Sequence, residues 1–364
     1  MADANESHWA EYSELQRVKH ELLRRYLGAW FGILGLSHPG FVYLETHAGR
    51  GRFLSGEPGS PIVALKTLLD HRFRDRILGD VGAAFILIEE DQDNAAALEA
   101  EIRSLGPLPA RVRVHVVRSD YESQLEAAIG TLSARHRPPM FMFVDPFGFK
   151  LRVDLLRQYL RQDGCEILLN FMWRNMSQAL GQPDTFGPLL DATFGASQWT
   201  ALNDIAGFHE RCDAALRLLS ARLGAIHFRD IKMLGSNGVI KYVLLHLANH
   251  PLALRKMNEA LWGLAPDGDF RVRQNDDPAQ QVMFSQEPDL SPLAELLWSK
   301  FGGSRARVKQ IDEAATTFWL AKHSHDVLRN WYQRGAIRVL GEPKLVFSHN
   351  PEIEFTTRPE PLLS

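Results

Sequence analysis

Residues 44–61, LETHAGRGRFLSGEPGSP, place an acid and two closely spaced glycines directly after a short apolar run. Such turns let the backbone approach a cofactor. The third glycine of the dinucleotide fingerprint is replaced by Leu54, and no Gly-Lys-Ser/Thr of a phosphate loop follows. Because Glu45 precedes the G-x-G of Gly49 and Gly51 by four residues, the spacing suits S-adenosylmethionine, which has no pyrophosphate to cradle.

Within this loop, Glu45 can balance the cofactor's ammonium group, directly or through water. His47 and Ala48 are predicted to line the cofactor pocket together with Gly49 and Gly51. The alternative is that the glycines only shape a tight turn, and the loop alone does not decide between the two.

Two further predicted strands end in polar residues. The strand FILIEED ends in Glu89 and Glu90, of which Glu89 is favoured as the acceptor for the ribose hydroxyls. After the next strand, Asp120 can accept the adenine amino hydrogens and Tyr121 can pack on the base. The acids also suit the start of a helix, where they favour the dipole or cap the first turn.

The stretch FMFVDPFG puts Asp145 and Pro146 at the tip of a fourth strand, beside the expected position of a transferable methyl group. Enzymes that methylate exocyclic amines often carry Asp or Asn, two prolines and an aromatic residue at this point. Here Phe147 replaces the second proline and Gly148 the aromatic, so the amine hypothesis is weakened. Asp145 is predicted to orient the acceptor with Phe147 stacking on it, and Asn170 can add a polar contact. A strand-ending turn is the structural alternative.

Other chemistries find less support. Cytosine C5 methylation needs a thiolate at a strand tip, whereas Cys165 lies before its strand. His323 and His325 have no third metal ligand nearby, so solvated positions on a helix are favoured.

Strands and helices alternate over about 130 residues from position 40 onward, which predicts an α/β fold with a Rossmann-like, doubly wound parallel sheet. Residues 8–34 precede it as an amphipathic helix on which Lys19, Arg24 and Arg25 are expected to face solvent.

The predicted methyltransferase-like domain covers residues 1–265. It includes a helical insertion over about 173–224, followed by a hairpin at 226–247. A linker rich in Gly, Pro and Asp covers 266–286.

Residues 287–355 predict a winged helix, with three helices and a hairpin of strands 336–340 and 345–347. Between positions 300 and 344 there are nine Lys or Arg and four Asp or Glu. Lys322, Arg329 and Arg334 lie on the helix that such domains present to DNA. Docking of a protein is the alternative.

Composition limits the partners. The formal net charge is −3 over 364 residues, so nucleic-acid contact must come from a local patch. There are two cysteines without metal-binding spacing, and no apolar run has membrane-spanning length. A polar, acidic N-terminus does not suit a secretory signal, and we expect a cytoplasmic protein without a membrane partner.

The order of these motifs resembles the three-Cys-motif partner (TcmP) family, a class I methyltransferase-like group. The resemblance implies a class I methyltransferase sheet and a partner protein with a three-cysteine, iron–sulfur motif. Members tend to read D-G-F-A-G in the first loop, and His47 is a departure from that wording. The resemblance spans most of the chain and rests on KHELLRRYLGAW, AGRGRF, GEPGSP, FVDPFG, LLNFMW and YVLLHLANHPLALRKMNEALW.

The sequence thus predicts methyl transfer from S-adenosylmethionine to a nucleic acid, DNA or RNA. The main alternative is a catalytically degenerate binding protein that serves its three-Cys-motif partner in nucleic-acid repair or defence. A nicotinamide oxidoreductase is weaker because Leu54 breaks the dinucleotide fingerprint.

Overall fold

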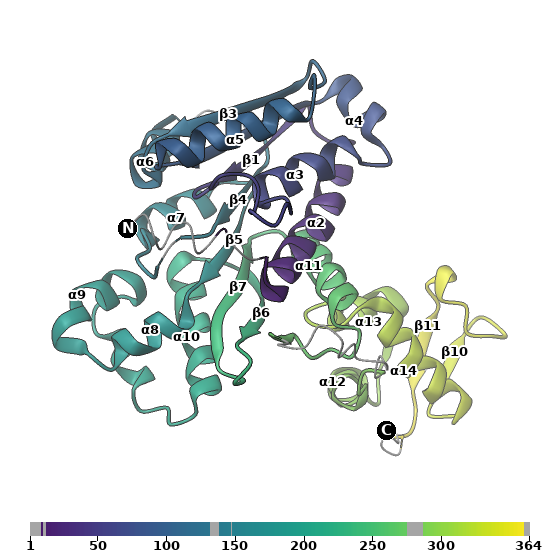
Figure 1. Ribbon diagram of the computed structural model, residues 1–364. Helices are drawn as coiled ribbons and strands as arrows, with labels where there is room; N and C mark the ends of the chain where they lie inside the picture. Colours follow the sequence, from purple (N-terminus) through teal and green to yellow (C-terminus); the bar gives the residue numbers. More distant parts are fainter. Residues whose placement is uncertain (1–8, 10–11, 132–137, 147, 275–286, 360–364) are drawn as a thin grey trace. The chain divides into compact units, whose positions relative to one another are not determined.

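The computed structural model describes residues 9, 12–131, 138–146, 148–274 and 287–359 (Figure 1). The chain divides into two compact units. The first comprises Met1–Ala253 and Phe270–Gln280, and the second comprises Leu254–Asp269 and Gln281–Ser364. Within the described residues, no helix combines the length and apolar composition needed to cross a bilayer.

The first unit is built on an eight-stranded sheet of order β3-β2-β1-β4-β5-β7-β6-β8. Strands β1 to β5 pair in parallel, whereas β7 is antiparallel to both β5 and β6. The predicted parallel sheet and the β6–β7 hairpin are therefore confirmed. The strands are β1 Gly40–Glu45, β2 Gly82–Glu89, β3 Val112–Arg118, β4 Met140–Val144, β5 Cys165–Phe171, β6 His227–Leu234, β7 Ile240–Ala248 and β8 Arg271–Arg273.

Strand β8 lies inside the segment expected to be a linker. It pairs in parallel with β6, through Lys232↔Arg271 to Leu234↔Arg273. The sequence did not predict this edge strand, because three residues are too few to show a periodic pattern within a segment rich in Gly, Pro and Asp. Residues 275–286 of the expected linker lie outside the described residues.

Alternate residues of the central strands face opposite layers of helices. Tyr26 of α2 packs on Phe141, with ring centroids 5.4 Å apart. The neighbouring Met140 and Met142 belong to the hydrophobic core that also contains Leu156 of α7. Burial on both faces explains why these strands read as continuous apolar runs.

Helices connect the strands at nearly every crossover. A capping box between Ser13 and Gln16 starts α2, which packs against α3. Figure 1 shows these two helices side by side. The helix before β1 is α2 Glu14–Leu34. The helices that connect β1 to β5 are α3 Ser60–Leu69, α4 Arg74–Asp80, α5 Gln92–Ser104, α6 Tyr121–Thr131 and α7 Val153–Leu160.

The segment between β5 and β6 is helical. It contains α8 Trp173–Leu180, α9 Pro183–Phe194, the short 3₁₀ helix η1 Gln198–Leu202 and α10 Phe208–Leu223. Helix α10 packs on α7, so these helices extend the layer on one face of the sheet. After β7 the chain forms α11 Pro251–Leu264.

The second unit contains three helices and a three-stranded antiparallel sheet of order β10-β11-β9. The predicted strand at 345–347 is wrong: residues Phe347–His349 form the 3₁₀ turn η2. The partner of β10 is β11, whose buried Ile353 and Phe355 alternate with glutamates. In chain order the elements are α12 Ser291–Phe301, β9 Arg305–Arg307, α13 Val308–Ala315, α14 Ala321–Gln333, β10 Ile337–Leu340 and β11 Glu352–Phe355.

Candidate functional site

A cavity of about 410 Å³ opens at the carboxyl ends of β1, β4 and β5. This is the edge at which open parallel sheets bind ligands, and the volume lies within the usual range for small-molecule sites. Of the predicted site residues, the cavity is lined by His47, Ala48, Asp145 and Pro146. Helix α2 contributes Lys19 and His20, β7 contributes Lys241 and Tyr242, and Gln274 lies directly after β8.

The glycine loop has backbone angles that only glycine adopts readily. Gly49 and Gly51 have φ values of +62° and +82°. A Cβ on Gly49 would lie 2.3 Å from the Trp9 ring, and a Cβ on Gly51 would lie 2.8 Å from Leu98. Trp9 also accepts a backbone hydrogen bond from Leu54. The loop is therefore fixed both by its own conformation and by an aromatic ring packed onto it.

Glu45 is fully buried at the end of β1 and does not line the cavity. Its carboxyl group accepts hydrogen bonds from the hydroxyls of Tyr43 and Ser60, and Ser60 does line the cavity. Burial raises the pKa of Glu45 to about 8, although both hydrogen bonds oppose the rise. Ser60 thus stands between Glu45 and the cavity, and the Glu45 carboxyl group is largely protonated at neutral pH.

Glu89 lies at the end of β2, is 6% exposed and is outside the cavity lining. It accepts the backbone N–H of Gly49 at 2.7 Å and that of Asp91 at 3.0 Å. Burial raises its pKa, against the effect of these backbone donors. The neighbouring Glu90 is exposed.

Asp120 directly precedes α6, Tyr121 is the first residue of that helix, and both lie outside the cavity lining. The Asp120 carboxylate accepts the backbone N–H of Ser123 at 2.8 Å, and this bond lowers its pKa. The Tyr121 ring lies 4.8 Å from that of His47. Its hydroxyl accepts the backbone N–H of Arg152 at 3.3 Å. Asp120 therefore serves as the helix cap, while Tyr121 reaches the back of the glycine loop.

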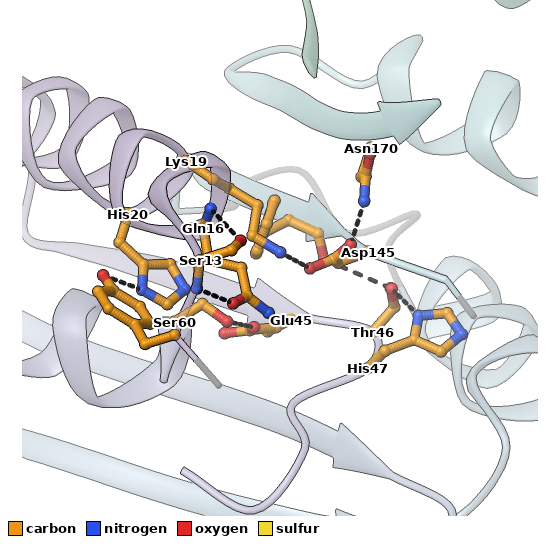
Figure 2. Close-up of polar contacts among 12 residues, drawn as sticks. Ser13, Gln16, Lys19, His20, Glu45, Thr46, His47, Ser60, Asp145 and Asn170 are labelled. Atoms are coloured by element: carbon orange, nitrogen blue, oxygen red, sulfur yellow. Dashed lines mark hydrogen bonds and ion pairs between the residues drawn. The ribbon is translucent and has the colours of Figure 1, made fainter. Parts of the chain in front are cut away.

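Asp145 is the centre of a polar cluster (Figure 2). Lys19 Nζ lies 2.6 Å from Asp145 Oδ2, and Asn170 Nδ2 lies 2.5 Å from Asp145 Oδ1. The side chains of Lys19 and Asp145 are 9% and 18% exposed. Burial alone would raise the pKa of Asp145, but the Lys19 ammonium and the Asn170 amide hold it below its ordinary value. The carboxylate is therefore ionised and accepts hydrogen bonds only.

The orientation of Asn170 follows from this contact. Its amide nitrogen must face Asp145, since the reverse orientation would set two oxygens against each other. Its Oδ1 atom is then buried without a hydrogen-bond partner among the described residues. Pro146 is buried beside the cluster, and the predicted stacking residue Phe147 lies outside the described residues.

Two histidines of the cavity are held neutral. Burial lowers the pKa of His20 to about 3, and its Nδ1 lies 3.0 Å from the Tyr12 hydroxyl. Burial likewise lowers the pKa of His47 to about 4, even though Asp145 opposes the shift. At neutral pH, Lys19 and Asp145 therefore carry the charge in this part of the cavity.

The expectation that Lys19 faces solvent is wrong, whereas Arg24 and Arg25 are exposed as expected. Lys19 and Asp145 are separated by 126 positions, so no local pattern pairs them. The signal that could have identified Lys19 is its place on α2: it follows Leu15 by four residues and precedes Leu22 and Leu23 on the buried face.

In the second unit, Lys322, Arg329 and Arg334 are exposed on or directly after α14. Arg329 forms an ion pair with Asp326 at 2.7 Å and lies 5.6 Å from the Phe347 ring. The expectation that His323 is solvated is wrong, because it is buried against Trp262 with ring centroids 4.3 Å apart. No cluster of potential metal ligands is found among the residues that the structure describes.

Comparison with models of known protein families finds no match, and comparison with curated protein sequences finds none either. Among solved structures, protein LPL1258 of Legionella pneumophila (family DUF519) matches at 16% identity and a TM-score of 0.40, over 69% of this chain and 92% of that one. Human methyltransferase-like protein 13, solved in complex with SAH, matches at 14% identity and a TM-score of 0.34. The match covers 73% of this chain and 97% of that one.

A third similar structure is the DszA carbon methyltransferase, at 17% identity and a TM-score of 0.31. The match covers 58% of this chain and 48% of that one, so the chain spans about half the length of this relative. Likeness at these scores does not identify an activity, and the case for function therefore rests on the geometry of the chain.

Proposed function

We propose that the chain is an S-adenosylmethionine-dependent methyltransferase that acts on a nucleic acid. The observation that carries the proposal is the cavity at the carboxyl edge of the sheet, whose wall joins the glycine loop to Asp145. The strand order β3-β2-β1-β4-β5-β7-β6 with β7 antiparallel supports it, because this is the order of the class I methyltransferase sheet that the sequence resemblance implies.

The residues around the cavity fit the methyl donor. His47, Ala48 and Asp145 would contact the cofactor. The buried ammonium of Lys19 at the cavity wall would bind the carboxylate of the cofactor. Glu45 would act through Ser60. Trp9 and Leu98 occupy the space beside Gly49 and Gly51, so these glycines would act by shaping the loop that carries His47 and Ala48. Glu89 accepts the Gly49 N–H and would reach the ribose. Glu90, Asp120 and Tyr121 complete the proposed adenosine side.

When bound, S-adenosylmethionine supplies a methyl group on a sulfonium, which is already a good leaving group. The chain therefore needs to position the acceptor more than to activate it. Asp145 can accept a further hydrogen bond beyond those from Lys19 and Asn170, because a carboxylate offers about four lone-pair sites. Its lowered pKa makes it a weak base, so it orients an N–H rather than removing its proton.

The second unit supports a nucleic-acid acceptor. Its order of helix, strand, two helices and two strands is consistent with the winged helix we propose, in which α14 would be the recognition helix. Lys322, Arg329 and Arg334 would contact phosphates, although Asp326 neutralises part of this face.

The first test is calorimetric titration with S-adenosylmethionine, followed by transfer of a labelled methyl group to mixed DNA and RNA. We expect wild type to bind and Glu89→Ala to bind much more weakly. Asp145→Ala should abolish transfer while its cofactor affinity stays within a few-fold of wild type. Equal loss of both functions in Asp145→Ala would contradict the assignment of Asp145 to the acceptor.

A second candidate is a catalytically degenerate binding protein that serves a three-Cys-motif, iron–sulfur partner. The ion pair of Asp145 with Lys19 favours it, because an incoming amine would compete with a buried ammonium for the same carboxylate. Cofactor binding without transfer to any nucleic acid, together with capture of an iron–sulfur protein, would favour this candidate.

A further inference from the structure

Strand β7 carries an irregularity at the cavity. Met233 of β6 lies opposite Tyr242, but the next residue, Leu234, lies opposite Ile240. Lys241 is therefore an extra residue on β7, which is the arrangement of a β-bulge. Successive side chains of a regular strand point to opposite faces, whereas Lys241 and Tyr242 both line the cavity. The bulge thus brings a lysine to a position that regular pairing would turn away.

A second cation lies beside the same turn. A Cβ on Gly235 would lie 3.1 Å from Lys241 Cε, and a Cβ on Gly238 would lie 3.3 Å from Arg273 Nη2. The side chains of Lys241 and Arg273 therefore both pack over the turn 235–238. Lys241 Nζ donates to Gln274 Oε1 at 2.6 Å, and this acceptor is neutral.

The neighbouring Lys232 shows the contrast. It is half-buried and forms ion pairs with Asp213 at 2.8 Å and Asp230 at 3.1 Å. Within the part of the chain that the structure describes, Lys241 and Arg273 have no carboxylate partner. An ammonium and a guanidinium without acids, next to a cavity, are suited to a phosphate group.

We propose that Lys241 and Arg273 form a phosphate-binding subsite that holds the backbone of a single-stranded nucleic acid while the adjoining base enters the cavity toward Asp145. This inference rests on the proposed function and specifies the substrate of the same site. Because the Asp145 side chain is only 18% exposed in the cavity wall, a base must leave its stack to reach it, so the target base is unpaired or flipped out. Tyr242, which lines the cavity next to Lys241, offers an aromatic side chain to such a base.

The test compares Lys241→Gln/Arg273→Gln with wild type in the full-length chain. The affinity for a short fluorescein-labelled single-stranded oligonucleotide, as DNA and as RNA, is measured against salt concentration. Two lost phosphate contacts should reduce the slope of log K against log salt by about 1.4. The matched control, Arg72→Gln/Arg76→Gln, removes the same charge from exposed positions before β2, at the opposite edge of the sheet. It should keep the wild-type slope.

Lys241→Arg separates charge from folding, because it keeps the cation and should retain the wild-type slope. An unchanged slope in the double variant, an equal loss in the control pair, or an absence of oligonucleotide binding by wild type would overturn the subsite. These results do not depend on the cofactor, so they stand even if no methyl transfer is found. If transfer is found, the double variant should raise KM for the oligonucleotide by a larger factor than it lowers kcat.

Discussion

Glu89 and Asp145 both end a strand of the same sheet, yet their carboxylates are held in different ways. Glu89 at the end of β2 accepts backbone N–H groups from Gly49 and Asp91, which lie at the adjacent turns. Asp145 after β4 accepts side-chain donors from Lys19 of α2 and from Asn170 of β5. One carboxylate shapes a loop, and the other joins three elements.

The difference extends to their charge. With neutral donors around it, Glu89 has a pKa raised by burial, whereas an ammonium holds the pKa of Asp145 low. The Glu89 carboxyl group is therefore easier to protonate than a free glutamate, whereas the Asp145 carboxylate remains ionised in the cavity wall. Removing each group should accordingly have different consequences for stability and for ligand binding.

The largest effect is expected from Asp145→Ala. It leaves the Lys19 ammonium buried without its carboxylate, and breaking a buried ion pair in this way typically costs about 3–5 kcal/mol. The measurement is the free energy of unfolding from urea denaturation at neutral pH. A loss below about 1 kcal/mol would show that water replaces the carboxylate at little cost.

The control for this prediction is the cycle with Lys19→Met. Because the double variant leaves no buried ammonium, it should be more stable than Asp145→Ala alone. Additive losses in the cycle would mean that the two side chains are not coupled, contrary to their 2.6 Å contact.

Gly49→Ala should have the next largest effect, of about 3 kcal/mol. About 1 kcal/mol or more arises from a left-handed φ of +62°, and the rest from the clash of the new methyl group with Trp9. Since the Gly49 N–H also donates to Glu89, the substitution should disturb the Glu89 carboxyl group at the end of β2 and leave the Asp145 cluster intact.

Unfolding experiments on paired variants test this account. In a Trp9→Ala background, the cost of Gly49→Ala should fall to about 1 kcal/mol, the strain alone. Gly106→Ala is the matched control, because its φ is +82° and nothing lies within 4 Å of the added carbon. Equal losses at Gly49 and Gly106 would exclude a steric role for Trp9.

The same contrast explains which parts of the molecule could be predicted from sequence. Strands β1, β2, β4 and β5 were predictable because each contains an apolar run between helices with clear periodicity, and β3 because its valines alternate with polar residues. The polar ends of these strands, including Glu89 and Asp145, were predictable for the same reason. Their assigned ligand roles remain predictions.

The long-range contacts were not predictable in this way. The pairing of Lys19 with Asp145 depends on how α2 packs on the sheet, and the position of Trp9 on Gly49 depends on where the chain lies before α2. The bulge at Lys241 could not be predicted either, because β7 contains no glycine, the residue that often marks a bulge in a strand sequence. Local periodicity predicts elements, whereas these features arise only when separate elements meet.

Glu45 adds a third carboxylate, with hydroxyl donors only, and predicts a pH dependence of opposite sign to that of Asp145. With a folded pKa of about 8, Glu45 keeps a proton that the unfolded chain releases near pH 4.5. Its contribution to stability is therefore lost as the pH rises between these values, by up to about 1.4 kcal/mol per pH unit. The lowered pKa of Asp145 instead gives stability that is lost as the pH falls below about 4.

Unfolding by urea at a series of pH values measures this slope. Glu45→Gln should flatten the decline between about pH 5 and 8, since glutamine does not titrate. Glu90→Gln, at an exposed position, should leave it unchanged. A decline that persists in Glu45→Gln would assign it to another group.

The smallest stability effect is expected for Glu89→Gln, about 1 kcal/mol. The amide keeps one acceptor oxygen, so one of the two backbone donors from Gly49 and Asp91 loses its partner, while no buried charge is left uncompensated. Its effect on titration with S-adenosylmethionine should nevertheless exceed that of Asp145→Asn, because the glycine loop is the part of the site that Glu89 holds. Asp145→Asn removes the negative partner of the buried Lys19 ammonium and should cost more stability than Glu89→Gln, so the two variants should rank in opposite order for stability and for cofactor affinity. If one variant is worse on both scales, the division between a carboxylate that shapes the cofactor loop and one that serves the acceptor is wrong.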